Sequence, residues 1–104
     1  MQGENKMSEK VYLTALLKVK SEKVEKLKSA ALAIVGDSRN EEGCISYNVH
    51  QSIEDETVFI WREAWKSKTD LDQHFEKDYV KKFFGVVNEV AAEPPQITLT
   101  NLIS

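Results

Sequence analysis

The fold is decided by two short segments, EEGCISYNVHQS at residues 41–52 and VFIWREAW at residues 58–65. The first segment alternates apolar with polar residues, which is the period of a half-buried strand. Its apolar positions, expected on one face, are Ile45, Tyr47 and Val49. The second segment is rich in β-branched and aromatic residues, which also favour a strand. The polar residues 52–57 between them predict a hairpin loop.

Upstream of this hairpin, residues 11–20 predict a strand with apolar side chains on both faces, as in a central strand covered on both sides. Ser21 is the predicted N-cap of the following helix, whose apolar residues recur every three or four positions. That helix should end between Arg39 and Gly43. Gly43 is expected to close it by adopting a positive φ angle.

Downstream of the hairpin, Ser67 and Asp70 have the spacing of a capping box that begins a helix. A second helical stretch is predicted over residues 79–92, with a kink at residues 78–79 between the two. Two consecutive prolines then stop the helix, because proline disfavours helical backbone at the residue before it. Residues 96–103 predict the last strand.

The predicted order is therefore β-α-β-β-α-β, with the second helix split in two. This order indicates an α+β sandwich of the ferredoxin-like type. Two layers leave one face of the sheet bare, yet the strands carry apolar residues on both faces. A large exposed apolar face is normally a partner surface. We therefore expect a homodimer packed sheet against sheet, a dimeric α/β-barrel-type assembly.

The chain has 104 residues, which we divide into a flexible tail at 1–10 and a single domain at 11–104. The net charge is −3, with acidic and basic residues interleaved, which argues against nucleic acid or an anionic membrane as partner. No apolar run approaches the ~20 residues that span a bilayer, and no apolar leader is evident. The single cysteine, Cys44, favours a reducing cytoplasm and is expected to pack rather than react.

The sequence does not indicate a metal or cofactor site. Its two histidines and one cysteine lack the spacing of metal ligands such as H-x-x-x-H or C-x-x-C. Its four glycines form no phosphate-binding loop, and no nucleophile elbow is present. We therefore expect no metal and no cofactor.

The candidate functional residues gather in the hairpin and in the helix after it. His74 shares a helical face with apolar residues, where it can act as a base near neutral pH or simply pack and bond a carbonyl. Trp65 and Trp61 share a strand face, as a wall for a flat ligand or as core. Glu63 lies between them, and a buried carboxylate needs a partner. It either ties the strand to a helix or orients His74.

Three segments resemble the antibiotic biosynthesis monooxygenase family, which includes quinol monooxygenases. They are EGCISY at residues 42–47, FIWREAW at 59–65 and LDQH at 71–74. The resemblance implies a ferredoxin-like homodimer with a cavity between sheet and helices. Several members oxidise phenols or quinols with dioxygen and without metal or flavin. It also implies a catalytic role for the helical histidine, His74. The predicted substrate-binding residues are Trp65, Trp61, Glu63, Phe75, Tyr79 and Phe83.

Two positions depart from the family pattern. Tyr79 stands where many members carry a second histidine, and Ala15 is the position closest to the asparagine of the haem-degrading branch. Haem degradation is therefore not expected. Three hypotheses remain: a cofactor-independent monooxygenase, an isomerase or other enzyme acting on a small polar metabolite, and a non-catalytic dimeric binding protein. An apolar cavity with one histidine favours the first, several basic residues the second, and a filled cavity the third.

Overall fold

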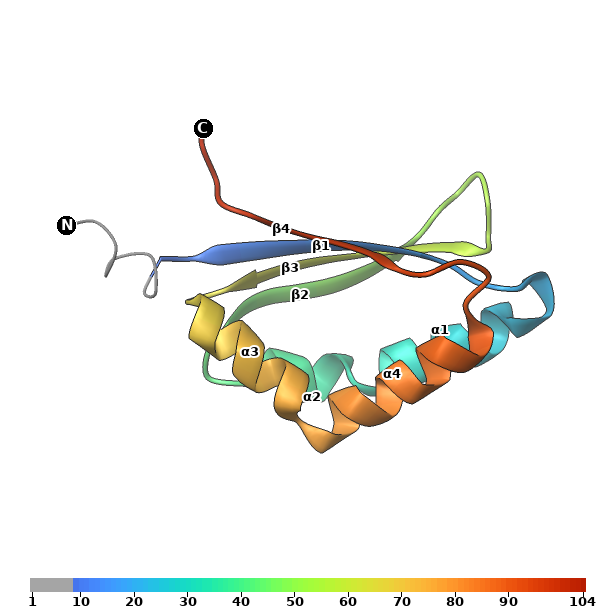
Figure 1. The fold of residues 1–104 in the computed structure, drawn as a ribbon, viewed down its shortest axis with the longest axis horizontal. Coiled ribbons are helices and arrows are strands. Elements are labelled where there is room, and N and C mark those ends of the chain that lie inside the picture. The colour runs from blue at the N-terminus through green and yellow to red at the C-terminus, as the bar shows by residue number, and fades with distance from the viewer. Residues whose placement is uncertain (1–8) are drawn as a thin grey trace.

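A four-stranded antiparallel sheet forms one layer of the molecule (Figure 1). The computed structural model describes residues 9–104. The strands are β1 (Val11–Lys18), β2 (Cys44–Gln51), β3 (Val58–Trp65) and β4 (Gln96–Thr100), in the order β2-β3-β1-β4. The ferredoxin-like order predicted from the sequence is confirmed. The predicted hairpin loop is also confirmed, because β2 and β3 are joined by residues 52–57.

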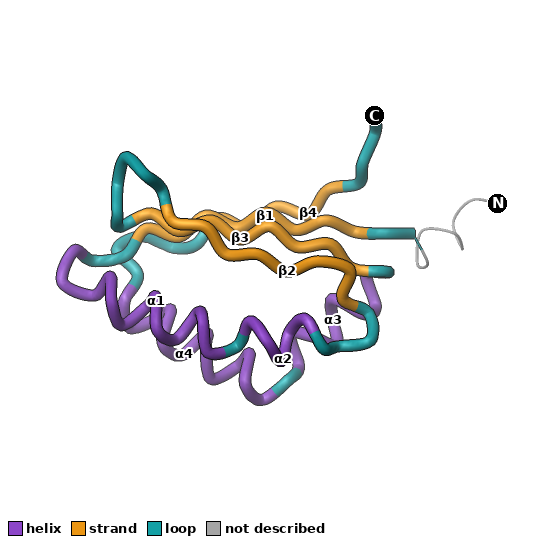
Figure 2. The backbone as a smooth tube through the Cα atoms, turned by 180° about the vertical axis from the view of Figure 1, so that it is seen from behind, coloured by secondary structure: helices purple, strands orange, loops and turns teal. Residues whose placement is uncertain are grey.

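The helices form the second layer and all lie against one face of the sheet (Figure 2). They are α1 (Val24–Ala33), α2 (Val35–Arg39), α3 (Lys68–Glu76) and α4 (Asp78–Val90), preceded by a 3₁₀ turn at Ser21–Lys23. Within residues 9–104, no helix covers the other face of the sheet. Among residues 9–104, no helix has both the length and the apolar character needed to cross a membrane.

The core fills the space between the two layers. Its sheet residues alternate along each strand as predicted, so that Leu13 and Leu17 on β1 face the same side as Phe59 and Trp61 on β3. The helices contribute the apolar stripes that their sequences predict: Leu27, Ala31, Leu71, Val80, Phe83, Val87 and Val90.

The break between α3 and α4 agrees with the predicted kink. Lys77 takes extended backbone angles, with φ −65° and ψ 140°, and so ends one helix and precedes the next. The predicted capping box is present, because the Ser67 side chain accepts a hydrogen bond from the backbone N–H of Asp70 at 3.1 Å. This cap fixes where α3 begins and therefore which of its residues face the sheet.

The first helical region differs from its prediction. The Ser21 side chain makes no N-cap hydrogen bond, and a 3₁₀ turn precedes α1. Ile34 takes φ −105° and ψ 4°, which separates α1 from α2, whereas one continuous helix was expected. The region ends at Arg39, within the predicted bounds.

Gly43 does not have the positive φ angle that the sequence suggested, since no glycine in residues 9–104 has one. The physical reason for glycine here is a close approach. A Cβ atom at this position would lie 2.3 Å from Cβ and Cγ of Asp70. The Gly43 carbonyl also accepts a 2.9 Å hydrogen bond from the backbone N–H of Lys66. Gly43 thus holds the start of β2 against the start of α3.

A β-bulge changes the faces of the first residues of β2. Cys44 pairs with Trp65, but Ser46 already pairs with Ala64, so Ile45 is an extra residue on this strand. Ile45 is 46% exposed, and the prediction that it shares a face with Tyr47 is wrong. Cys44 takes the inner position instead and packs against the core, as expected of it. Burial raises the pKa of its thiol to about 11, so the thiol remains protonated at neutral pH.

Candidate functional site

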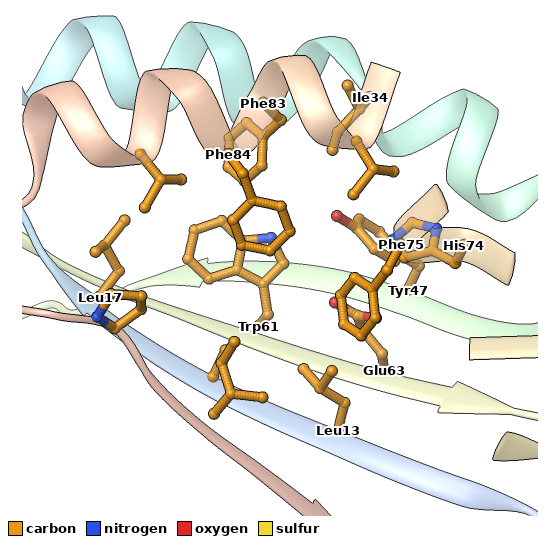
Figure 3. Close-up of a pocket in the computed structure, with 15 residues that line it drawn as sticks. Leu13, Leu17, Ile34, Tyr47, Trp61, Glu63, His74, Phe75, Phe83 and Phe84 are labelled. Carbon is orange, nitrogen blue, oxygen red and sulfur yellow. The ribbon is translucent and has the colours of Figure 1, made fainter. Parts of the chain in front are cut away.

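A cavity of about 50 Å³ lies between the sheet and the helices α3 and α4 (Figure 3). Its wall is mostly apolar and aromatic. The lining residues are Leu13, Ala15, Leu17, Ile34, Tyr47, Trp61, Glu63, His74, Phe75, Val80, Phe83, Phe84, Val87, Pro95 and Ile97. No lysine or arginine belongs to this lining in the described part of the chain. The three polar side chains, Tyr47, Glu63 and His74, lie together at one end of the cavity.

His74 reaches this end from α3, because the capped start of that helix turns it toward the sheet together with Leu71. Its side chain is nearly inaccessible to solvent. The Nδ1 atom lies 2.7 Å from Oε2 of Glu41, a residue in the loop between α2 and β2. The hydroxyl of Tyr79 donates a hydrogen bond to the same oxygen. Three side chains from separate segments thus meet at Glu41.

The contact with Glu41 decides which nitrogen of His74 is available. An ionised carboxylate can only accept hydrogen bonds, so Nδ1 is the nitrogen that carries the proton. Within residues 9–104, Nε2 makes no hydrogen bond. A neutral His74 therefore keeps Nε2 as a free acceptor, and the carboxylate of Glu41 can stabilise the ring when it becomes charged. Such a carboxylate–imidazole pair is suited to general-base chemistry.

Glu63 is only 7% exposed and comes from β3, where it points into the cavity. Its Oε1 accepts a 2.9 Å hydrogen bond from the indole N–H of Trp65. Burial raises the pKa of Glu63 to about 7. The Trp65 hydrogen bond opposes this shift, and the negative charge of Glu41 adds to it. The carboxyl group of Glu63 therefore gains and loses its proton near neutral pH.

Tyr47 lies opposite Glu63 in the β2–β3 register and is 2% exposed. Burial raises the pKa of its hydroxyl far above the usual value, and the charge of Glu63 raises it further. The neighbouring Ser38 and Trp61 side chains act in the opposite direction. Burial likewise raises the pKa of Tyr79, together with its bond to Glu41. Both phenol groups therefore remain protonated donors at neutral pH.

The predicted site residues separate into two groups. His74, Trp61, Glu63, Phe75 and Phe83 lie on the cavity wall. Trp65 and Tyr79 do not.

Trp65 is fully buried and packs against the imidazole of His74, with the two ring centroids 4.6 Å apart. Tyr79 lies outside the lining and contacts the site through its hydrogen bond to Glu41.

Sequence reasoning missed Glu41 and misassigned Glu63. The carboxylate that contacts His74 is Glu41, whereas Glu63 is bonded to Trp65 on its own strand, so Glu63 neither orients His74 nor ties β3 to a helix. Glu41 lies in a loop, where no periodicity predicts the direction of a side chain. Tyr47 was also missed, although its place opposite Glu63 follows from pairing the two predicted strands.

Metal ligation has no candidate group in this part of the chain. Among residues 9–104, no three histidine, cysteine, aspartate or glutamate side chains lie close enough together to hold an ion.

Comparisons with known proteins give one family model and two related sequences. The family model described as antibiotic biosynthesis monooxygenase matches residues 10–86. The chain is 32% identical over 92 residues to the "Putative monooxygenase YcnE" of Bacillus subtilis, covering 88% of this chain and 97% of that protein. It is 30% identical over 83 residues to the "Uncharacterized protein sll1783" of Synechocystis, covering 80% of this chain and 56% of that protein.

A solved structure shows the same fold. The "Putative antibiotic biosynthesis monooxygenase from Nitrosomonas europaea" superposes with a TM-score of 0.87 at 25% identity, over 92% of each chain.

Proposed function

Because the chain belongs to the antibiotic biosynthesis monooxygenase family, we propose that it is a small monooxygenase that oxidises a phenolic or quinol-type molecule with dioxygen, without metal or organic cofactor. The observation that carries this proposal is the Glu41–His74 pair. His74 lines an aromatic cavity, and its Nε2 atom is free because Nδ1 contacts Glu41. Of the three hypotheses from the sequence, this lining favours the cofactor-independent monooxygenase. Among the described residues, the lining contains one histidine and neither lysine nor arginine.

The wall supports a flat aromatic substrate. Trp61 and Phe83 lie with ring centroids 5.9 Å apart, and Phe75 and Phe84 lie 6.0 Å apart. A cavity of about 50 Å³ has room for only a few water molecules. A substrate ring therefore enters as wall side chains move aside. Phe75 and Phe84 are only half-buried and are the side chains we expect to move.

The chemistry begins with a proton. His74 Nε2 takes the proton from a substrate hydroxyl, and Glu41 stabilises the resulting imidazolium. The phenolate is electron-rich enough to reduce dioxygen directly. For a quinol, one oxygen atom enters the ring and the other leaves as water, giving a hydroxyquinone. The substrate loses four electrons and dioxygen gains four. The electrons therefore balance without a metal or a flavin.

We also propose that the working unit is a homodimer formed through the open sheet face. Leu16 and Ile60 are register partners on the two central strands and are only half-buried in one chain, as is Tyr12 four residues earlier on β1. Thr14 and Arg62 on the same face are exposed and provide polar contacts. Cover by a second sheet removes the apolar residues from water.

The direct test is oxygen uptake. Purified protein is supplied with a panel of benzene- and naphthalene-1,4-diols in an oxygen electrode, with the uncatalysed oxidation subtracted. The proposal predicts enzyme-dependent uptake and a product that carries one atom from ¹⁸O₂. Uptake no faster than the uncatalysed reaction across the panel, or a product without the label, would overturn it.

A further inference from the structure

Two hydrogen-bonding groups in the cavity have free capacity that the mechanism above does not use. Oε2 of Glu63 has no hydrogen-bond partner within residues 9–104. The Tyr47 hydroxyl lies near the side chains of Ser38 and Trp61, but it makes no hydrogen bond of good geometry with either of them in the same residues. The two residues are opposite each other on neighbouring strands. Figure 3 shows the oxygen atoms of both directed into the cavity on the side of Trp61. Polar groups that face a cavity and have free hydrogen-bonding capacity can bind a polar ligand atom there.

Glu63 has no positively charged partner among the described residues. The titratable groups that face it are Cys44 and Tyr47 on β2, His74 on α3 and Glu41 in the loop before β2. β1 presents the apolar Leu13 in register with it. No lysine or arginine forms an ion pair with it in the described chain. A buried carboxyl group in such surroundings favours its neutral form, which is a hydrogen-bond donor.

We propose that the Tyr47 hydroxyl and the Glu63 carboxyl together form a binding site for the phenolate oxygen of an aromatic ligand. The inference rests on the proposed function and refines it. His74 removes the proton from the substrate hydroxyl, and the two donors hold the negative oxygen that results. Donors aimed in advance at a developing charge, inside a site that excludes water, are an effective form of electrostatic stabilisation.

The protonation of the two donors is consistent with this role. The pKa of Glu63 is raised to about 7, so a large fraction of the group is a neutral acid at neutral pH. Tyr47 remains protonated well above that pH. Ionisation of Glu63 replaces a donor by an anion next to the bound phenolate. Phenolate affinity should therefore fall as the pH rises through the pKa of Glu63.

The test measures binding without turnover. The probe is 2,4-dinitrophenol, which is ionised over the whole range used, and 2,4-dinitroanisole is the matched neutral ligand. Calorimetric titration measures the affinity for each ligand at pH 6 and at pH 8.5. The preference for the phenolate is the ratio of the two affinities at one pH. Glu63→Gln supplies an amide donor that never ionises, and Tyr47→Phe removes the other donor. Glu42→Gln, at an exposed position, and Tyr12→Phe, on the open sheet face, are the matched controls.

The proposal predicts that the native protein prefers the phenolate at pH 6 and loses about 10-fold of that preference by pH 8.5, since hydrogen bonds to charged groups contribute roughly that factor. Glu63→Gln should keep the preference at both pH values. Tyr47→Phe should lose about 10-fold at both. Controls should match the native protein. Thermal unfolding of each variant verifies that it is folded.

The contradicting results are distinct. If Glu63→Gln retains the full loss between pH 6 and pH 8.5, the pH dependence does not come from Glu63 and the inference is wrong. It is also wrong if Tyr47→Phe binds like the native protein, or if the native protein shows no preference. Predicted binding without oxygen uptake from any quinol would leave the phenolate site standing and overturn the monooxygenase proposal. Oxygen uptake without the predicted binding would do the reverse.

Discussion

At the scale of single residues, the site is defined by what its two carboxyl groups contact. The carboxyl group of Glu41 contacts the imidazole of His74 and accepts a hydrogen bond from the hydroxyl of Tyr79. Glu63 has one indole donor and no cation, and its pKa rises to about 7. Two glutamates of one site thus have different surroundings, because Glu41 contacts an imidazole and a phenol whereas Glu63 contacts only an indole.

Glu63 should make the stability of the fold depend on pH. Its folded-state pKa of about 7 lies above the value of 4.5 expected for the unfolded chain. The native state therefore holds this proton more tightly, and its stability falls as the pH rises from 4.5 through 7. Glu63→Gln removes that loss. Relative to the native protein, its free energy of unfolding should rise by roughly 3 kcal/mol between pH 5 and pH 8.

Urea unfolding at the two pH values measures this difference, with Glu42→Gln as the exposed control. A constant difference between Glu63→Gln and the native protein would show that Glu63 ionises alike in the folded and unfolded states.

At the scale of secondary structure, the arrangement of the site depends on how closely the start of β2 approaches α3. Gly43 allows this approach, and Glu41, two residues earlier, is thereby placed next to His74. The bulge at Ile45 adds one residue to the strand, so that Cys44 and Tyr47 both face inward although they are three residues apart. The break at Lys77 lets α3 and α4 present His74 and Phe83 to the same space.

Gly43→Ala should destabilise the fold by about 1–3 kcal/mol, the usual cost of overpacking, because the new methyl group would lie 2.3 Å from Asp70 atoms. Gly85→Ala is the matched control. It lies in α4 with nothing within 4 Å of its added Cβ, so helix propensity should make it neutral or stabilising. Denaturant midpoints of the two variants test the account. Equal effects would mean that the Gly43 contact carries no energy.

At the scale of the whole molecule, residues 9–104 leave one face of the sheet without a covering helix. Half-buried apolar residues lie on the two central strands of that face. We predict a dimer in solution, with an interface above ~1,000 Å², as expected of a stable complex. Leu16→Lys should shift the molecule toward the monomer, because it places a charge among half-buried residues. Lys18, already exposed on this face, provides the control position as Lys18→Gln. Light scattering showing a native monomer at micromolar concentration would contradict the prediction.

The fold was predictable because its elements carry strong periodic signals. The β-branched and aromatic residues at 58–65 predict the second strand of the hairpin, the Ser67 cap predicts the start of α3, and both are found in the structure. Long-range details were not predictable. The φ of Gly43 depends on Asp70 packing against it, and the face of Ile45 depends on a shift in strand register. Neither contact leaves a periodic signal in the local sequence.

The candidate site was predictable to the extent that it lies on regular elements. Helix and strand periods place His74, Trp61 and Glu63 on inward faces, and all three line the cavity. The contact of Glu41 with His74 could not be predicted, because tertiary contacts alone position the loop that carries Glu41. Trp65 illustrates the other limit: periodicity assigns a residue to a face but does not tell a cavity wall from packed core.

The role of His74 as the base is tested by the turnover of His74→Ala on a substrate identified by oxygen uptake. The account predicts a loss of at least ~100-fold, because His74 supplies the base that a placed side chain provides. The circular dichroism spectrum should remain that of the native protein. His50→Ala, which removes the other histidine from an exposed position on β2, should leave turnover unchanged. Native turnover in a folded His74→Ala variant would show that His74 is not the base.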